Sequence, residues 1–358
     1  MLTSAALAGA GAFLAACGGA ASQRPASVGR VVFTRKLEGA VVPGPVLGPG
    51  GSVLAASNGG VLHALDPQTG KDRWRFDGHG NYGVDLSTSP LVLGSKLILW
   101  PGPNHQLHGL DAGGRARWSR KFASMPLTPA RGPRGTVYVM EMGGVLHALT
   151  VGSRGVRERW QLRVGPGTSY GSPAVGANGL VYTTVGRELV AVRDRGPRGQ
   201  VAWRFRAAAD VEVSPAVATD GTIVLGTNDR FEYGVAPDGQ ERWRVRRDVF
   251  TYSTPLTTPD GLVRYGDHRG RVFTVDAATG RVRHVDNAHG QVWTRPAVGR
   301  DGTVVVGTHK GEIDGFSATG RPVLRVRTGG SVESYPLTAP DGTTYIGSED
   351  GRLYAVRP

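Results

Sequence analysis

One column of residues in this sequence carries side chains that can grip a ligand. Proline recurs at eight positions about 41 residues apart, and the column lies three positions before these prolines. It reads Val42, Ser87, Pro126, Tyr170, Glu212, Tyr252, Trp293 and Glu333. Aromatic rings offer stacking faces and carboxylates accept hydrogen bonds, so the last five members suit a sugar, a basic group or a peptide. We predict a ligand-binding ring there; the alternative is that these loops simply tolerate polar and aromatic residues.

A second column contains three histidines. His63, His108 and His147 fill the same place in three successive copies, within Leu-His-Ala-Leu or Leu-His-Gly-Leu. A metal site needs its nitrogens about 2.1 Å from one ion, whereas equivalent positions of a radial array diverge. Phe273 and Tyr354 take this place in other copies. These histidines are therefore expected to pack or to hydrogen-bond, and no metal site is predicted.

No catalytic constellation stands out in the sequence. No Gly-x-Ser-x-Gly elbow precedes a helix, so a hydrolase nucleophile is not indicated. Residues 165–171 are rich in glycine but have neither the lysine nor the helix of a phosphate-binding loop. We predict that the chain is not an enzyme and that it has no catalytic residues and no cofactor.

These columns belong to a unit of about 41 residues that recurs eight times. Each unit contains short runs of alternating apolar and polar residues, such as residues 302–307 and 351–356, separated by Asp-Gly, Asn-Gly or Thr-Gly. Such runs are typical of strands joined by tight turns, and four fit into each unit. No helical periodicity continues past residue 16. The sequence predicts an all-β fold, an eight-bladed β-propeller with four-stranded antiparallel blades.

A third column indicates how the ring closes. It follows each proline by about 28 residues and reads Trp74, Trp118, Trp160, Trp203, Trp243, His284 and Leu324. An eighth member is missing at the C-terminal end, but residues 29–33 have the frame of residues 70–74, with Phe33 in the place of the tryptophan. We predict that residues 30–36 form the outermost strand of the last blade, beside residues 351–356, and that the column packs between blades.

The only cysteine follows an apolar run near the N-terminus. Residues 5–16 have the length of the apolar core of a secretory signal and are too short to span a bilayer. The sequence Leu-Ala-Ala-Cys at residues 14–17 resembles a bacterial lipobox, in which the cysteine is acylated. We predict a lipoprotein signal peptide at 1–16, lipidated Cys17 and a flexible tether at 17–28, and the propeller at 29–358. The alternative is an ordinary signal peptide that happens to contain a cysteine.

The chain is strongly basic, with 42 Lys and Arg against 29 Asp and Glu and a net charge of +13. Many arginines lie on the tryptophan-bearing runs, as in residues 242–247 and 321–327. Such a belt attracts anionic head groups or acidic partners, unless it reflects only a composition bias. Nucleic acid is not an expected partner of an exported chain.

The run ending in Ala-Leu-Asp, the Thr-Gly turn and the following tryptophan together resemble the repeat of the PQQ-like β-propeller family. The pattern is clearest at residues 66–74 and 270–280, and the resemblance covers residues 29–358. Within this family the chain is most similar to the BamB-type lipoproteins. That resemblance implies a non-enzymatic, monomeric scaffold that is lipid-anchored to the outer membrane, faces the periplasm and presents its loops to envelope proteins during outer-membrane β-barrel assembly.

Two other functions stay open at this point. One is a ligand-binding or quinoprotein-type catalytic propeller that uses the mouth of the ring axis. Quinoproteins of this fold often have adjacent cysteines beside the quinone, whereas this chain has one cysteine, and the BamB-type members bind no quinone. The other is a cell-surface adhesin or a sensor domain.

Overall fold

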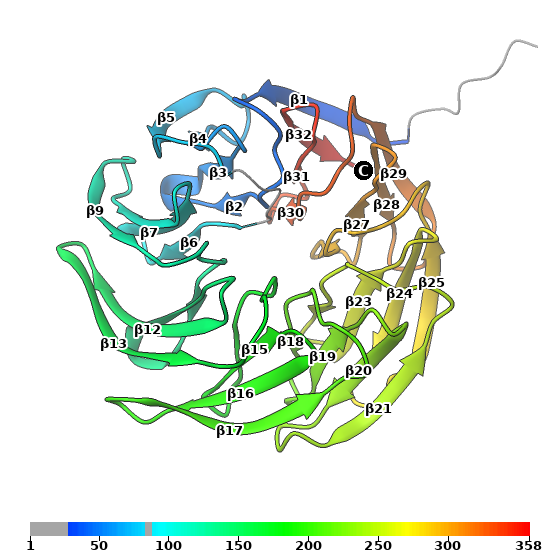
Figure 1. Ribbon diagram of the computed structural model, residues 1–358. Coiled ribbons are helices and arrows are strands. Elements are labelled where there is room, and N and C mark those ends of the chain that lie inside the picture. The colour runs from blue at the N-terminus through cyan, green and yellow to red at the C-terminus, as the bar shows by residue number, and fades with distance from the viewer. Residues whose placement is uncertain (1–27, 83–87) are drawn as a thin grey trace, which may run out of the picture.

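Eight four-stranded antiparallel sheets stand around a common axis and form a closed ring (Figure 1). The computed structural model describes residues 28–82 and 88–358. Besides strands, this part of the chain has two short 3-10 turns, η1 (Pro49–Gly51) and η2 (Pro133–Gly135). The predicted fold class is confirmed. Within the described residues, no helix is long and apolar enough to cross a membrane.

In the first four blades the strands follow chain order from the axis outward. Blade 1 contains β2 (Val46–Leu47), β3 (Val53–Ala56), β4 (Val61–Leu65) and β5 (Asp72–Asp77); blade 2 contains β6 (Leu91–Leu93), β7 (Leu97–Gly102), β8 (Gln106–Leu110) and β9 (Ala116–Lys121). Blade 3 contains β10 (Ala130–Arg131), β11 (Thr136–Met140), β12 (Val145–Gly152) and β13 (Gly155–Arg163); blade 4 contains β14 (Ala174–Val175), β15 (Leu180–Val185), β16 (Glu188–Asp194) and β17 (Gly199–Arg206).

The next three blades repeat this order. Blade 5 contains β18 (Ala216–Val217), β19 (Ile223–Gly226), β20 (Phe231–Val235) and β21 (Glu241–Arg246); blade 6 contains β22 (Leu256–Thr257), β23 (Leu262–Gly266), β24 (Arg271–Asp276) and β25 (Val282–Asn287). Blade 7 contains β26 (Ala297–Val298), β27 (Val304–Gly307), β28 (Glu312–Phe316) and β29 (Pro322–Arg327).

Blade 8 joins the two ends of the chain. Its three inner strands are β30 (Leu337–Thr338), β31 (Thr344–Gly347) and β32 (Arg352–Arg357), and its outermost strand is β1 (Arg30–Lys36). The blue β1 lies beside the red β32 in Figure 1, and Lys36 pairs with Arg352 in an antiparallel register. The predicted closure by residues 30–36 is confirmed, so backbone hydrogen bonds hold the seam of the ring.

The tryptophan column links each blade to the next. Each indole N–H donates a hydrogen bond to an oxygen of the following blade, at 2.8–3.0 Å, in the pairs Trp74 to Ala112, Trp118 to Gly152, Trp160 to Asp194, Trp203 to Pro237 and Trp243 to Ala277. On the third strand of the same blade, the residue that pairs with each tryptophan is a glycine or an alanine. At Gly109 a Cβ atom would lie 2.1 Å from Trp118. The predicted packing of this column between blades is therefore seen in the structure.

Phe33 takes the same position in blade 8. A Cβ atom on Gly70, in the outer turn of blade 1, would meet the Phe33 ring at 2.5 Å. Gly239, in the equivalent turn of blade 5, meets Trp203 at 2.7 Å. The Phe33 ring therefore seals the junction between the last and first blades as the tryptophans seal the others.

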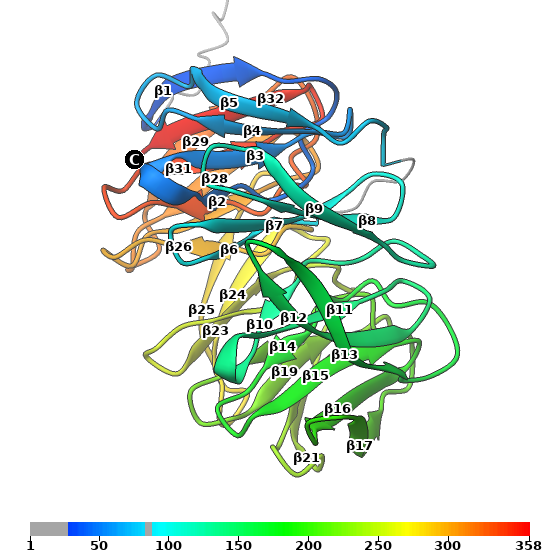
Figure 2. The ribbon, with the colours of Figure 1, turned by 90° about the vertical axis from the view of Figure 1, so that its left-hand side faces the viewer.

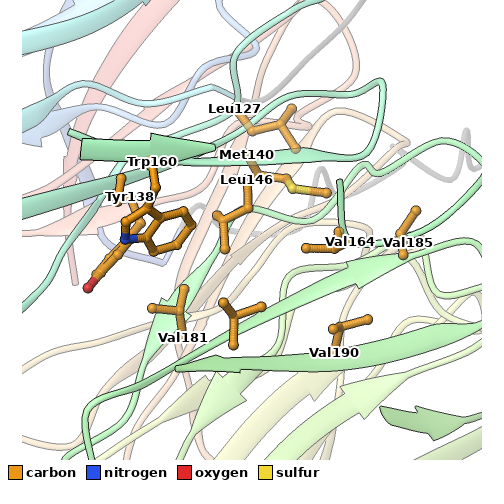
Figure 3. Close-up of a cluster of buried hydrophobic side chains, with 11 residues drawn as sticks. Leu127, Tyr138, Met140, Leu146, Trp160, Val164, Val181, Val185 and Val190 are labelled. Carbon is orange, nitrogen blue, oxygen red and sulfur yellow. The ribbon is translucent and has the colours of Figure 1, made fainter. Parts of the chain in front are cut away.

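The core of the molecule lies between the faces of neighbouring blades. Every residue of β3 and β4 is buried, whereas β5 alternates between exposed and partly buried residues. Figure 3 shows one such layer, in which Tyr138, Met140 and Trp160 of blade 3 pack on Val181 and Val190 of blade 4. Because apolar burial contributes about 25 cal/mol per Å², these layers between the blades stabilise the ring. Figure 2 shows the same ribbon turned by 90°.

Candidate ligand site at the mouth of the ring axis

The structure brings all five residues of the predicted ring together. Tyr170, Glu212, Tyr252, Trp293 and Glu333 line one cavity of about 330 Å³ at the ring axis. Each of them lies just before the innermost strand of its blade, so the repeat places them at one level around the axis. We call this cavity the mouth. Its volume lies within the range of small-ligand pockets; whether a ligand occupies it stays a prediction.

The other side of the mouth is different. Blades 1 to 3 contribute Val42, Thr88 and Leu127, which are small or apolar. In blade 3 the lining residue is one position later than the column predicts, and Pro126 itself pairs with Glu141 in an isolated β-bridge. Ser87 of blade 2 lies outside the described residues. Among the described residues, the aromatic and acidic groups of the mouth thus come from one side of the ring, blades 4 to 8.

Two histidines that sequence reasoning missed stack against the mouth aromatics. His268 and Trp293 have ring centroids 5.2 Å apart at an interplanar angle of 23°, and Trp293 and His309 are 4.4 Å apart at 19°. Tyr252 contacts His268 edge-on at 5.1 Å. Both histidines lie in the turn between the second and third strands of their blades, and their equal place in the repeat is the signal that identifies them. Together these rings form a continuous stack along one wall.

A serine, a histidine and a glutamate meet in this wall, but their geometry is not that of a catalytic triad. His309 Nδ1 lies 3.0 Å from a Glu333 carboxylate oxygen and 3.1 Å from the Ser331 hydroxyl. In a triad the nucleophile and the acid contact opposite nitrogens of the ring, which lets the imidazole take a proton from one side while the acid holds the other. Here both groups contact the same nitrogen. The arrangement fixes the rotamers of Glu333 and His309 and does not activate Ser331.

Burial shifts the protonation equilibria of two rings at the mouth, His268 and Tyr252, toward their neutral forms. Desolvation lowers the pKa of His268, and it raises the pKa of Tyr252, with a further contribution from the nearby Glu212 charge. Both rings are therefore uncharged at neutral pH. Glu212 and Glu333 are the acidic side chains that line the cavity, so this wall presents neutral π faces between two hydrogen-bond acceptors.

Two of the three column histidines are held between carboxylates. His63 lies 2.7 Å from Asp72 through Nδ1 and 2.6 Å from Glu38 through Nε2. His147 has the same arrangement, with Glu158 and Glu141 both at 2.6 Å. We call these two the clamp histidines. Within the described residues, no group of three or more histidine, cysteine, aspartate and glutamate side chains is arranged to hold a metal ion.

The third column histidine has no carboxylate partner within the described part of the chain. His108 stacks on Trp100 at 5.5 Å and meets the edge of Phe76 at 5.1 Å. Its Nε2 is buried, with no hydrogen-bond partner among the described residues. Desolvation, with a smaller repulsion from His79, lowers its pKa to about 4. The predicted packing or hydrogen-bonding role is thus seen for all three histidines, in two forms.

Cys17, the predicted lipidation site, lies outside the described residues.

Solved structures with similar folds are numerous. BamB from Moraxella catarrhalis matches with a TM-score of 0.71 at 19% identity, over 92% of this chain and 100% of that chain. Sqt1 from Saccharomyces cerevisiae matches with a TM-score of 0.76 at 13% identity, over 92% and 98% of the two chains. A computationally designed protein, Ika8, gives 0.74 at 15% identity, over 90% and 98%. These similarities show the propeller fold.

Two curated proteins share sequence with the chain. The serine/threonine-protein kinase AfsK of Streptomyces griseus is 29% identical over 314 residues, 86% of this chain and 33% of the kinase. The outer membrane protein assembly factor BamB of Bordetella pertussis is 27% identical over 131 residues, 36% of this chain and 33% of that protein. The aligned part thus spans about one third of the length of each curated relative.

A family model also matches the chain. The model described as "Outer membrane protein assembly factor BamB", built on PQQ-like repeats, matches residues 24–153 and 142–292. The two matches together cover well over half of the chain and include most of the blades that carry the repeat columns. The chain belongs to the PQQ-like β-propeller family described as outer membrane protein assembly factor BamB.

Proposed function

We propose that this chain is a non-enzymatic scaffold of the cell envelope that binds protein partners through its propeller loops and its axial mouth. The observation that carries the proposal is the mouth itself. Five side chains with stacking faces or carboxylates converge there from five blades. Groups of this kind recognise a ligand by contact, and the shared nitrogen of His309 argues against acyl-transfer chemistry at Ser331.

The finer part of the proposal is a role in outer-membrane β-barrel assembly. Its support is the family match, together with the aligned third of the Bordetella pertussis assembly factor. In this proposal the chain is exported, acylated on Cys17 and held as a monomer on the outer membrane, facing the periplasm. The lipobox-like residues 14–17 support the anchor, and a doubly or triply acylated cysteine holds a protein on a bilayer where one chain binds weakly.

Affinity purification from detergent-solubilised envelope, with mass spectrometry of the bound proteins, tests the scaffold. Wild type should co-purify with defined envelope proteins, and a Trp293→Ala, Glu333→Gln double variant should lose at least part of that set. Lys71→Ala, an exposed change on an outer turn, is the matched control and should leave the set intact. Recovery of no specific partner by wild type would contradict the scaffold function.

The anchor has its own test. Mass spectrometry of the mature N-terminus should find an acylated Cys17, and Cys17→Ser should move the protein to the soluble fraction or leave it unprocessed. An unmodified N-terminus at another residue would remove the lipid anchor from the proposal.

A sensor domain is the second candidate, and one observation favours it. The similarity to AfsK covers 86% of this chain, whereas the similarity to the curated assembly factor covers 36%. In this alternative the mouth binds a small envelope ligand and the chain reports its presence. If the set of co-purified proteins changes when the ligand is added, the sensor is favoured. If the same proteins co-purify with and without the ligand, the scaffold is favoured.

A further inference from the structure

A second cavity, of about 430 Å³, lies next to the mouth at the ring axis. We call this cavity the throat. Ser172, Ser214 and Tyr335 line both cavities, so the two are continuous. The throat wall includes the residue before each repeat proline, a column that reads Gly44, Ser89, Thr128, Ser172, Ser214, Thr254, Arg295 and Tyr335. Six blades thus contribute a hydroxyl group or a cation, and blade 8 contributes a phenol close to that cation.

Arg295 is the charged residue of this wall, and it has no counter-ion among residues 28–82 and 88–358. Among the described residues no carboxylate lies within ion-pair distance of its guanidinium, and its buried Nε has no hydrogen-bond partner. Its one close electrostatic neighbour is the Tyr335 ring, whose centroid lies 5.3 Å from Cζ. Burial lowers the pKa of Arg295, but a guanidinium does not deprotonate in proteins. Arg295 is only partly exposed. A cation held partly away from water without a partner costs free energy, so the site favours an anion that binds there.

The hydroxyl groups around Arg295 are able to donate to that anion. The backbone N–H of Ser89 donates to Thr128 Oγ1 at 2.8 Å, and the N–H of Ser172 donates to Ser214 Oγ at 2.9 Å. These two oxygens accept a backbone bond, so their own hydrogens are left to point elsewhere. The throat therefore combines a planar cation with hydroxyl donors, which matches a carboxylate.

The mouth has the opposite electrostatic character. Glu212 and Glu333 line it beside the faces of Tyr252 and Trp293, and acceptors next to π faces suit an organic cation. Trp293 and Arg295 are two positions apart in the loop that enters the innermost strand of blade 7, so their Cα atoms are at most about 7 Å apart. A ligand that satisfies both cavities therefore carries its cationic group within one or two residues of its carboxylate.

We infer that the throat is a carboxylate-binding subsite, and that the axial passage as a whole takes the free carboxyl end of a ligand with a basic group beside it. The inference rests on the proposed function in that it names what the mouth recognises. Its ligand chemistry has two sources, a free basic amino acid and the carboxyl terminus of a peptide.

Calorimetric titration with matched probes tests the inference. The probes are acetyl-Gly-Lys-Gly with a free carboxyl group, the same peptide as its carboxamide, and free lysine. Wild type should bind the free acid roughly 10- to 100-fold more tightly than the amide, which is the range for hydrogen bonds to a charged group. Arg295→Met and Arg295→Gln should remove this preference and leave the amide affinity unchanged. Arg300→Met, an exposed arginine of the same blade, should keep it.

The outcomes distinguish a free amino acid from a peptide end as the ligand, and a failure of this inference from a failure of the proposed function. Tighter binding of lysine than of the peptide assigns a small-molecule ligand, and the reverse assigns a peptide end. Equal affinity for acid and amide in wild type, or no heat with any probe, overturns the inference, as does a preference that survives Arg295→Met. Arg295→Met should also match or exceed the melting temperature of wild type, because it removes a partly buried charge that no carboxylate of the described residues compensates, whereas a large fall would make Arg295 structural. If the probes fail but envelope partners still depend on Trp293, the proposed function stands without this inference.

Discussion

The interior of the blades and the axial mouth use the same residue types in opposite ways. The clamp histidines His63 and His147 are 1% and 4% exposed, and both nitrogens of each face a carboxylate. His309 at the mouth is 45% exposed and stacks on Trp293. The tryptophans divide likewise: Trp203 donates its N–H to the next blade, whereas the buried Nε1 of Trp293 has no partner among the described residues.

The difference separates stability from recognition. A buried polar group whose hydrogen-bond partners are all present is held in one geometry, and substituting it destabilises the fold. A group at the mouth with an open face or an unused donor contributes little to folding and is available to a ligand. The same 41-residue repeat therefore yields structural and recognition positions according to their distance from the axis.

The largest expected effect is the loss of an interblade ring. Trp203→Ala removes the indole that packs on Gly239 and bonds to Pro237, and should lower the free energy of unfolding by roughly 3–5 kcal/mol. Chemical denaturation measures this. Trp293→Ala is the matched change at the mouth and should cost far less. Full stability of Trp203→Ala combined with lost partner binding would reverse the comparison.

Opening a clamp should come next. His147→Ala leaves Glu141, which is 3% exposed, without its imidazole partner. Burial would raise the pKa of Glu141, but the hydrogen bonds from His147 and Ser124 outweigh it and lower that pKa. Losing one partner of such a buried pair should cost roughly 3 kcal/mol. A His147→Ala, Glu141→Gln double variant should recover part of it in denaturant titrations; equal losses in both variants would contradict the clamp.

His108 should make the blade interior sensitive to acid. Its pKa is about 4 in the folded protein, below the ordinary 6.5. The unfolded chain therefore takes up a proton as the pH falls through 6.5, while the folded chain does so only near 4. Stability should drop over this window by roughly 2–3 kcal/mol. His108→Leu should remove this part of the pH dependence of unfolding; an unchanged slope between pH 6.5 and 4 would show that His108 does not titrate this way.

The smallest expected effect is at the mouth. His309→Ala removes a half-exposed ring whose contacts are one stacked face, Glu333 and Ser331, so the unfolding free energy should change by less than about 1 kcal/mol. Ligand affinity should fall, because the wall loses a ring and Glu333 loses its anchor. A loss of stability as large as that of His147→Ala would erase the distinction between the two regions.

Much of the fold and of the mouth could be predicted from the sequence. In a radial repeat, residues at the same number of positions from the repeat proline lie at the same distance from the axis. That relation is why Tyr170, Tyr252 and Trp293 were expected in one ring and why Phe33 was expected in the last blade. It failed by one residue in blade 3, where Leu127 lines the mouth and Pro126 pairs instead with Glu141 in an isolated β-bridge. A side-chain column cannot show such a local backbone pairing.

Other residues went unnoticed for a different reason. His268 and His309 come from turns between strands. Both meet Trp293 because the loop that enters blade 7 runs between the His268 turn of blade 6 and the His309 turn of blade 7 itself. Arg295 stands in a column of serines and threonines, and its type alone does not show that no carboxylate faces it. Whether two rings stack, or whether a carboxylate lies near a guanidinium, depends on which side chains are close in space. The repeat pattern of one sequence does not give that information.

The pairing of β1 with β32 also governs when the molecule can become complete. During synthesis β1 is made first, but its hydrogen-bonding partner is made last. Such a distant contact forms late, because a long loop must close before the pairing stabilises it. Until then Phe33 lacks its place against Gly70, and the edges of the first and last blades are unprotected. A chain that is interrupted before β32 therefore cannot close its ring, because β1 then has no strand to pair with.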